Sequence, residues 1–224
     1  MHRLDLIRVY MVGMLTATTL LGASGSPVAA QLGSRPAAEW ATTLENGQRL
    51  EALDIEEVVA AVGFRPGEVV ADIGAGTGIF SIPIARAVGP TGVVLSVEVD
   101  EGFLPIIEQK AREQGVANVR PVLGQFTDPR LPRRDVDVAF FHDVLHHIEQ
   151  RDMYLLTLAT YLESGSRVVV VDYDGNVPGV PHANQPEMLI RPADVAGWMD
   201  SAGFDLTREI DMFDDKFFVI YTKR

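Results

Sequence analysis

Three glycines at alternate positions follow an acidic side chain in the first half of the chain. Asp72 ends a short apolar run, and Gly74, Gly76 and Gly78 come directly after it. Glycine adopts positive φ and lacks a Cβ atom, so a ligand can lie against the backbone of such a turn. A helical pattern begins at Ile79, and the first N–H groups of a helix are free to bind a ligand. The spacing therefore predicts a strand, a glycine turn and a helix that bind a nucleoside-like molecule.

The same spacing excludes two common phosphate-binding motifs. Residue 79 is isoleucine where a dinucleotide fingerprint needs its last glycine, and the Gly-Lys-Ser/Thr of a P-loop is absent. The acidic residue, one apolar residue and Gly-x-Gly-x-Gly instead resemble the first motif of class I S-adenosylmethionine-dependent methyltransferases. A tight turn in an unrelated α/β protein is the alternative. The resemblance implies that S-adenosylmethionine is the cofactor and that it binds Asp72, Gly74, Ala75, Gly76, Thr77 and Gly78.

A second carboxylate is expected at the end of the next strand, because ligands in such sheets bind beyond the carboxyl ends of the strands. The apolar run from Val93 ends at Glu98 and Val99. A carboxylate can accept hydrogen bonds from two ribose hydroxyls at once. Asp100 is the alternative for this role. The methyltransferase pattern implies that Glu98, with Val99 beside it, binds the cofactor.

The third strand is followed by Gly124, Gln125 and Phe126. Members of the family usually carry an aspartate after this glycine, where it accepts a hydrogen bond from the adenine amino group. The amide oxygen of Gln125 can accept the same bond without a charge, which implies weaker adenine recognition. The Phe126 ring is suited to pack on the adenine face.

The fourth strand runs from Asp137 into His142 and Asp143, and a Leu-His-His-Ile turn follows. This segment resembles the fourth motif of small-molecule methyltransferases, and the whole resemblance covers roughly residues 48–172. It implies that His142 and Asp143 face the methyl donor.

Methyl transfer is an in-line displacement at a sulfonium, so the protein mainly aligns the nucleophile. A general base helps where the acceptor must lose a proton. His146 and His147 are the first candidates for this base, and His142 with Asp143 is a second acid–base pair. In the alternative interpretation, one histidine of the turn packs structurally and the other caps the next helix.

A metal site is a further interpretation of the same residues. His142, Asp143, His146 and His147 are close in the sequence, whereas His182 is elsewhere. Ligands at i and i+4 can share a metal when they lie on one helix face. Here they straddle a strand end and a turn, so we expect no metal. The proline-rich stretch 177–192 is expected to contribute the acceptor-side loop.

Strand-like and helix-like segments alternate along most of the chain, which predicts an α/β fold. We expect a doubly wound, Rossmann-like, seven-stranded sheet with helices on both faces. One helix is expected over residues 48–62. The runs Phe204–Met212 and Lys216–Thr222 are joined by so short a connection that they must be antiparallel, which predicts a C-terminal hairpin. The methyltransferase domain is expected to cover residues 48–224.

The first thirty residues differ from the rest. Arg3 and Arg8 precede an apolar run from Val9 to Ala23, and small residues lead up to Ala30. This order is typical of a secretory signal peptide, with cleavage expected after Ala30. The alternative is an uncleaved anchor, although the apolar run is short for a bilayer span. Residues 31–47 are expected to form a lead-in segment that folds over the site.

Composition limits the partners. The chain has 224 residues and a formal net charge of −12, without the basic patch that nucleic-acid binders need. It has no cysteine, which excludes disulfides and a cysteine nucleophile. We expect an exported, periplasmic or secreted, enzyme that methylates a small-molecule acceptor, binds no nucleic acid and has no stable membrane insertion once its leader is cleaved. The alternative is a secreted nucleoside-binding module without transferase activity.

Overall fold

The computed structural model describes residues 35–224. The predicted signal peptide and the alternative anchor, both in residues 1–30, lie outside the described residues. In the part of the chain that the structure describes, no helix has both the length and the apolarity to span a bilayer.

The centre of the fold is one sheet of seven strands in the order β3-β2-β1-β4-β5-β7-β6. The neighbouring strands from β3 to β5 are parallel. The observed order confirms the predicted doubly wound, seven-stranded architecture. The strands are β1 Val69–Ile73, β2 Val93–Glu98, β3 Val119–Leu123, β4 Val136–His142, β5 Leu162–Tyr173, β6 Phe204–Glu209 and β7 Lys216–Lys223.

The last strand is inserted between two others. β7 is antiparallel to β5, with Val170 opposite Val219, and antiparallel to β6, with Phe204 opposite Lys223. This arrangement confirms the predicted C-terminal hairpin, although β6 ends at Glu209 rather than at Met212.

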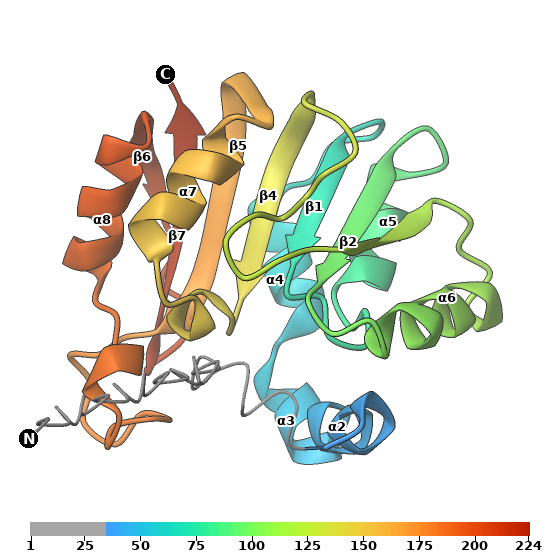
Figure 1. Ribbon diagram of the computed structural model, residues 1–224, viewed down its shortest axis with the longest axis horizontal. Coiled ribbons are helices and arrows are strands. Elements are labelled where there is room, and N and C mark those ends of the chain that lie inside the picture. The colour runs from blue at the N-terminus through green and yellow to red at the C-terminus, as the bar shows by residue number, and fades with distance from the viewer. Residues whose placement is uncertain (1–34) are drawn as a thin grey trace, which may run out of the picture.

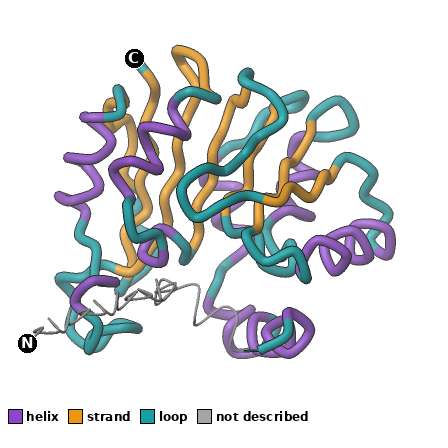
Figure 2. Tube along the Cα trace, viewed as in Figure 1, coloured by secondary structure: helices purple, strands orange, loops and turns teal. Residues whose placement is uncertain are grey.

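Helices cover both faces of the sheet (Figures 1 and 2). On one face, α4, α5 and α6 pack on buried aliphatic residues such as Val70 and Val94, and on the other, α7 and α8 pack on residues such as Phe141 and Val170. The helices are α2 Ala37–Leu44, α3 Gly47–Ala52, α4 Ile55–Val62, α5 Ser81–Val88, α6 Phe103–Glu113, α7 Arg151–Ala159 and α8 Pro192–Ser201, with short 3-10 turns η1 Leu145–His147 and η2 Pro186–Met188.

The prediction of one helix over residues 48–62 is wrong. Asp54 adopts a left-handed conformation, with φ of 44°, and separates α3 from α4. Leu53, immediately before it, is 2% exposed and joins the core. α4 buries Val58 and Val62, whereas α3 has no buried residue and only its Leu50 packs partly against the core. Apolar residues thus continue on both sides of the break and conceal it. The break allows α2 and α3 to lie beyond the carboxyl ends of the parallel strands (Figure 1).

Candidate cofactor and acceptor site

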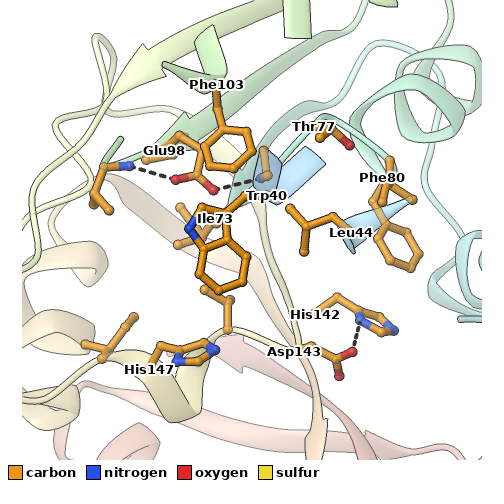
Figure 3. A pocket seen from close by; sticks show the side chains of 18 of the residues that line it. Trp40, Leu44, Ile73, Thr77, Phe80, Glu98, Phe103, His142, Asp143 and His147 are labelled. Atoms are coloured by element: carbon orange, nitrogen blue, oxygen red, sulfur yellow. Dashed lines mark hydrogen bonds and ion pairs between the residues drawn. The ribbon is translucent and has the colours of Figure 1, made fainter. Parts of the chain in front are cut away.

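A pocket of about 220 Å³ lies at the carboxyl ends of the central strands. The side chains of Trp40, Glu98, His142 and His147 surround the same space (Figure 3). Most of the predicted site residues line it, namely Gly74, Ala75, Gly76, Thr77, Glu98, Val99, Gln125, Phe126, His142, Asp143 and His147. Asp72, Gly78 and His146 are not part of the lining.

The glycine turn follows β1 and has the backbone conformation that its sequence predicts. Gly74, Gly76 and Gly78 have φ values of 70°, 54° and 79°. A Cβ atom on Gly74 would lie 2.3 Å from Cγ2 of Val144, so only glycine fits there. The N–H groups of Gly74 and Ala75 both donate to the carbonyl of Val97, which fixes the turn to β2. The turn therefore presents bare backbone to the pocket from a rigid support.

Glu98 is held at the pocket wall by two backbone N–H groups. Gly76 donates to its Oε1 at 2.7 Å, and Val99 donates to its Oε2 at 2.9 Å (Figure 3). Burial raises the pKa of Glu98, and these N–H donors oppose that rise. Asp100, the alternative ribose ligand, accepts from the N–H of Gly102 at 2.8 Å and does not line the pocket. The geometry therefore favours Glu98 for the ribose, a role that stays a prediction.

Asp72 lies behind the glycine turn, so the geometry does not support its predicted contact with the cofactor. The Ser81 hydroxyl donates to Asp72 Oδ2 at 2.5 Å, and the Ser96 hydroxyl donates to Ser81 Oγ at 2.7 Å. Burial raises the pKa of Asp72 to about 7, although the Ser81 hydrogen bond lowers it. Asp72 thus ties β1 to the start of α5 and positions the turn. Gly78 is also behind the surface of the pocket, where its N–H donates to the carbonyl of Ala75.

Gln125 and Phe126 lie at the rim of the pocket, beyond β3. The backbone groups of Gln125 pair with those of Asp128 and form a small closed loop. Phe126 is 43% exposed, so its ring is accessible to a flat ligand. Their contacts with adenine stay predictions.

His142 ends β4 inside the pocket, with its ring stacked on Phe80 at 4.4 Å between centroids. Neither ring nitrogen of His142 has a hydrogen-bond partner among the described residues. Its Nδ1 lies 3.5 Å from Oδ2 of Asp143. The other carboxylate oxygen of Asp143, Oδ1, pairs with the Lys216 ammonium at 2.9 Å. Burial opposes the charge of Asp143, but His142 and Lys216 more than offset it and hold the pKa of Asp143 below its usual range. The site therefore contains an ionised carboxylate beside an imidazole whose Nε2 has no partner among the described residues.

The two histidines of the η1 turn have adjacent rings, with 4.1 Å between the centroids, but only one of them lines the pocket. His146 is 4% exposed, and its Nδ1 lies 2.6 Å from Oδ1 of Asp172 on β5. Since it does not line the pocket, the predicted role of His146 as a general base is not supported. His147 does line the pocket, but burial lowers its pKa to about 3, as do the neighbouring His146 and His182. An imidazole with so low a pKa is a weak base at neutral pH.

Residues of the N-terminal segment complete the pocket. Trp40 and Leu44 on α2, Arg49 on α3, and Leu53 line it. The sequence placed residues 31–47 over the site without identifying these side chains. Trp40 was the available signal, because an aromatic residue in a polar segment needs an apolar surface to cover.

Comparison with known proteins agrees with this fold and site. The relatives include two ubiquinone/menaquinone biosynthesis C-methyltransferases UbiE. The one from Vibrio campbellii is 30% identical over 50% of this chain and 43% of the relative. The one from Ectopseudomonas mendocina is 30% identical over 53% of this chain and 46% of the relative. The chain thus spans less than half the length of these curated relatives.

Solved structures share the fold. A SAM-dependent methyltransferase from Aquifex aeolicus superimposes with a TM-score of 0.73 at 22% identity, over 82% of this chain and 96% of that one. Magnesium protoporphyrin IX methyltransferase (ChlM) from Synechocystis with bound SAM superimposes with a TM-score of 0.62 at 20% identity, over 84% of this chain and 90% of that one.

The fold and the pocket define a class I S-adenosylmethionine-dependent methyltransferase. The sequence model described as "Methyltransferase domain" matches residues 64–203, and the chain belongs to that family. The cofactor is S-adenosylmethionine. The residues present fit it, because the turn of Gly74 and Gly76 lines the pocket with backbone and Glu98 supplies an oriented carboxylate for a ribose.

Proposed function

We propose that this methyltransferase acts on a small, largely apolar acceptor. Beyond the glycine turn, the pocket wall consists mainly of apolar side chains, among them Trp40, Leu44, Phe80 and Ile148. Such walls suit a ring or chain of low polarity, and a few polar groups orient it. The names of the relatives, ubiquinone and menaquinone C-methyltransferases, support an acceptor with an aromatic ring.

The buried Nε2 of His142, which has no partner among the described residues, is the observation that carries the proposal. A buried polar group without a hydrogen bond is costly, and such groups persist where a ligand satisfies them. When bound, S-adenosylmethionine supplies an activated methyl group on a sulfonium. His142 accepts the proton that the acceptor loses, and the Asp143 carboxylate, 3.5 Å from Nδ1, stabilises the imidazolium that results. Lys216 keeps that carboxylate ionised.

A His142→Gln variant of the full chain tests this role. The assay follows transfer of a labelled methyl group from S-adenosylmethionine to a panel of phenols and quinols. We expect kcat to fall by about 100-fold or more, because a general base contributes roughly 10²- to 10⁴-fold. The cofactor Kd should change by less than about twofold, since Gln retains a polar side chain of similar length.

Three results would contradict the proposal. Full activity of His142→Gln would remove His142 as the base. Cofactor binding without methyl transfer to any acceptor would favour the nucleoside-binding module instead. Transfer confined to a charged, strongly polar acceptor would exclude the apolar acceptor class.

The exported location is a separate proposal that rests on the sequence of residues 1–30 alone. The N-terminal residue of the mature protein and its compartment test it. Cleavage after Ala30 is the expected result, and an intact N-terminus would favour the anchor.

A further inference from the structure

Two consecutive histidines and a third from a distant part of the chain meet beside the pocket. The described residues bring His146, His147 and His182 together, with one ring nitrogen of each within 4.8 Å of the others. Their ring centroids are 4.1 Å apart for His146 and His147, 5.2 Å for His146 and His182, and 5.5 Å for His147 and His182. His182 comes from the loop after β5, which lies at the same end of the sheet as α2 and α3 (Figure 1). Chain folding therefore assembles a cluster that the sequence spacing does not contain.

A buried carboxylate orients one member of this cluster. Asp172 is fully buried, and it accepts both the Nδ1–H of His146, at 2.6 Å, and the backbone N–H of His146, at 3.1 Å. With Nδ1 engaged, the lone pair of His146 is on Nε2. A carboxylate that fixes the tautomer and angle of a histidine is the usual outer partner of a metal ligand.

The conformation of His182 is a further sign of a built site. Its φ is 63°, in the left-handed region, which is uncommon for residues other than glycine although histidine adopts it more often than most. Such conformations cost free energy and are concentrated at functional sites.

We propose that His146, His147 and His182 bind a divalent transition metal, with Zn²⁺ as the best match. Three imidazoles and one open position are the ligand set of a catalytic zinc site. Since His147 lines the pocket, the open position faces the space where the acceptor binds. A metal there would hold an oxygen or nitrogen atom of the acceptor.

The geometry needs only a small adjustment. At Zn–N distances of about 2.0–2.1 Å, the nitrogens of a tetrahedral site lie about 3.4 Å apart. In this structure the ring nitrogens of the three histidines lie within 4.8 Å of one another. His146 is fixed by Asp172, so the half-buried His182 must move inward with its loop.

The charges around the cluster allow a cation. Imidazole coordinates a metal ion through a neutral ring nitrogen, so three histidines supply three ligand atoms. Arg151 is the nearby cation, and its guanidinium donates to the carbonyl of His146 at 2.6 Å. Asp172 places a carboxyl group beside the same imidazole, with Oδ1 at 2.6 Å from Nδ1 of His146.

Metal binding to the chelator-treated full chain tests the site, with Co²⁺ and Zn²⁺ as probes. We expect one Co²⁺ per chain with the intense visible absorption of tetrahedral cobalt, and displacement of that ion by Zn²⁺. His182→Ala should weaken Zn²⁺ binding by more than about 100-fold, because loss of an outer partner alone costs about 10- to 100-fold. Asn184→Ala, an exposed change on the same loop, is the matched control and should leave Zn²⁺ affinity unchanged.

The variant His147→Gln and the ligand S-adenosylmethionine distinguish loss of the metal site from unfolding and from loss of the cofactor site. His147→Gln should lose Zn²⁺ affinity as His182→Ala does, and without metal both variants should unfold at the temperature of metal-free wild type. S-adenosylmethionine affinity should be unchanged in His182→Ala, so failure of the metal site is distinguishable from failure of the proposed methyl transfer. Absence of tetrahedral Co²⁺ binding, or equal Zn²⁺ affinity in wild type and His182→Ala, would overturn the proposal.

Discussion

Glu98 offers the sharpest test of the cofactor site. Its carboxylate accepts from the N–H groups of Gly76 and Val99 and is 9% exposed, so it is oriented before any ligand arrives. A ribose hydroxyl that binds this carboxylate therefore gains a hydrogen bond to a charged group with little ordering cost. Such a bond contributes about 1.5–3 kcal/mol. At about 1.4 kcal/mol per factor of ten, Glu98→Ala should raise the S-adenosylmethionine Kd by about 10- to 150-fold.

Glu98→Gln sharpens the test, because it changes charge and donor pattern at constant shape. The amide retains one acceptor oxygen, but its NH₂ group must face either the N–H of Gly76 or that of Val99. These nitrogens are 2.7 Å and 2.9 Å from the present oxygens, so one donor faces another. We expect a loss of affinity comparable to that of Glu98→Ala.

Isothermal titration calorimetry with S-adenosylmethionine measures both variants against Asp100→Asn. Asp100 follows the same strand but hydrogen-bonds Gly102 outside the pocket, so its Kd should stay within about twofold of wild type. A Kd for Glu98→Ala within that range, or an equal loss in Asp100→Asn, would refute the assignment of Glu98 to the ribose.

Two further predictions concern the support of the glycine turn. The pKa of Asp72 is about 7 in the folded chain, against an ordinary value of 3.8. Between these pH values the folded chain keeps a proton that the unfolded chain releases. The free energy of unfolding therefore falls as pH rises through this range. Urea unfolding should therefore show that the free energy of unfolding of Asp72→Asn rises by about 1–3 kcal/mol relative to that of wild type between about pH 4 and pH 8. A difference in free energy of unfolding that stays constant over this range would contradict a buried, protonated carboxyl. Gly74→Ala combines a φ of 70° with a contact of 2.3 Å to Val144, and should lower the free energy of unfolding by about 2–5 kcal/mol. The control Gly197→Ala, in α8 with no neighbour within 4 Å, should raise it by about 0.5–1 kcal/mol, and equal effects of the two changes would contradict the packing argument.

The parts of the site that depend on local sequence could be predicted from it. The glycine turn needs residues without Cβ at fixed offsets, and the sheet needs apolar runs at regular intervals, so both leave a signal in a short window. The carboxylate of Glu98 follows from the same rule, because parallel strands end at one edge. The lining of the pocket by Gly74, Gly76 and Glu98 agrees with this reasoning.

The parts that depend on tertiary packing could not be predicted. Asp72 looks like a ligand in the sequence, and only the packing of α5 shows that Ser81 occupies its carboxylate. His182 is separated from His146 by α7, β5 and the start of the proline-rich loop, so no local pattern brings them together. The break at Asp54 leaves no signal in the sequence, because apolar residues continue on both sides of it.

The position of β7 has a consequence for the order in which the sheet can form. β7 follows β6 in the sequence, yet it supplies the hydrogen-bond partners of both β5 and β6. Until β7 has been synthesised, β5 therefore has an open edge and β6 has no neighbour to pair with. An unpaired strand edge is a site of edge-to-edge aggregation, so the growing chain is most exposed to aggregation in the interval before β7 pairs.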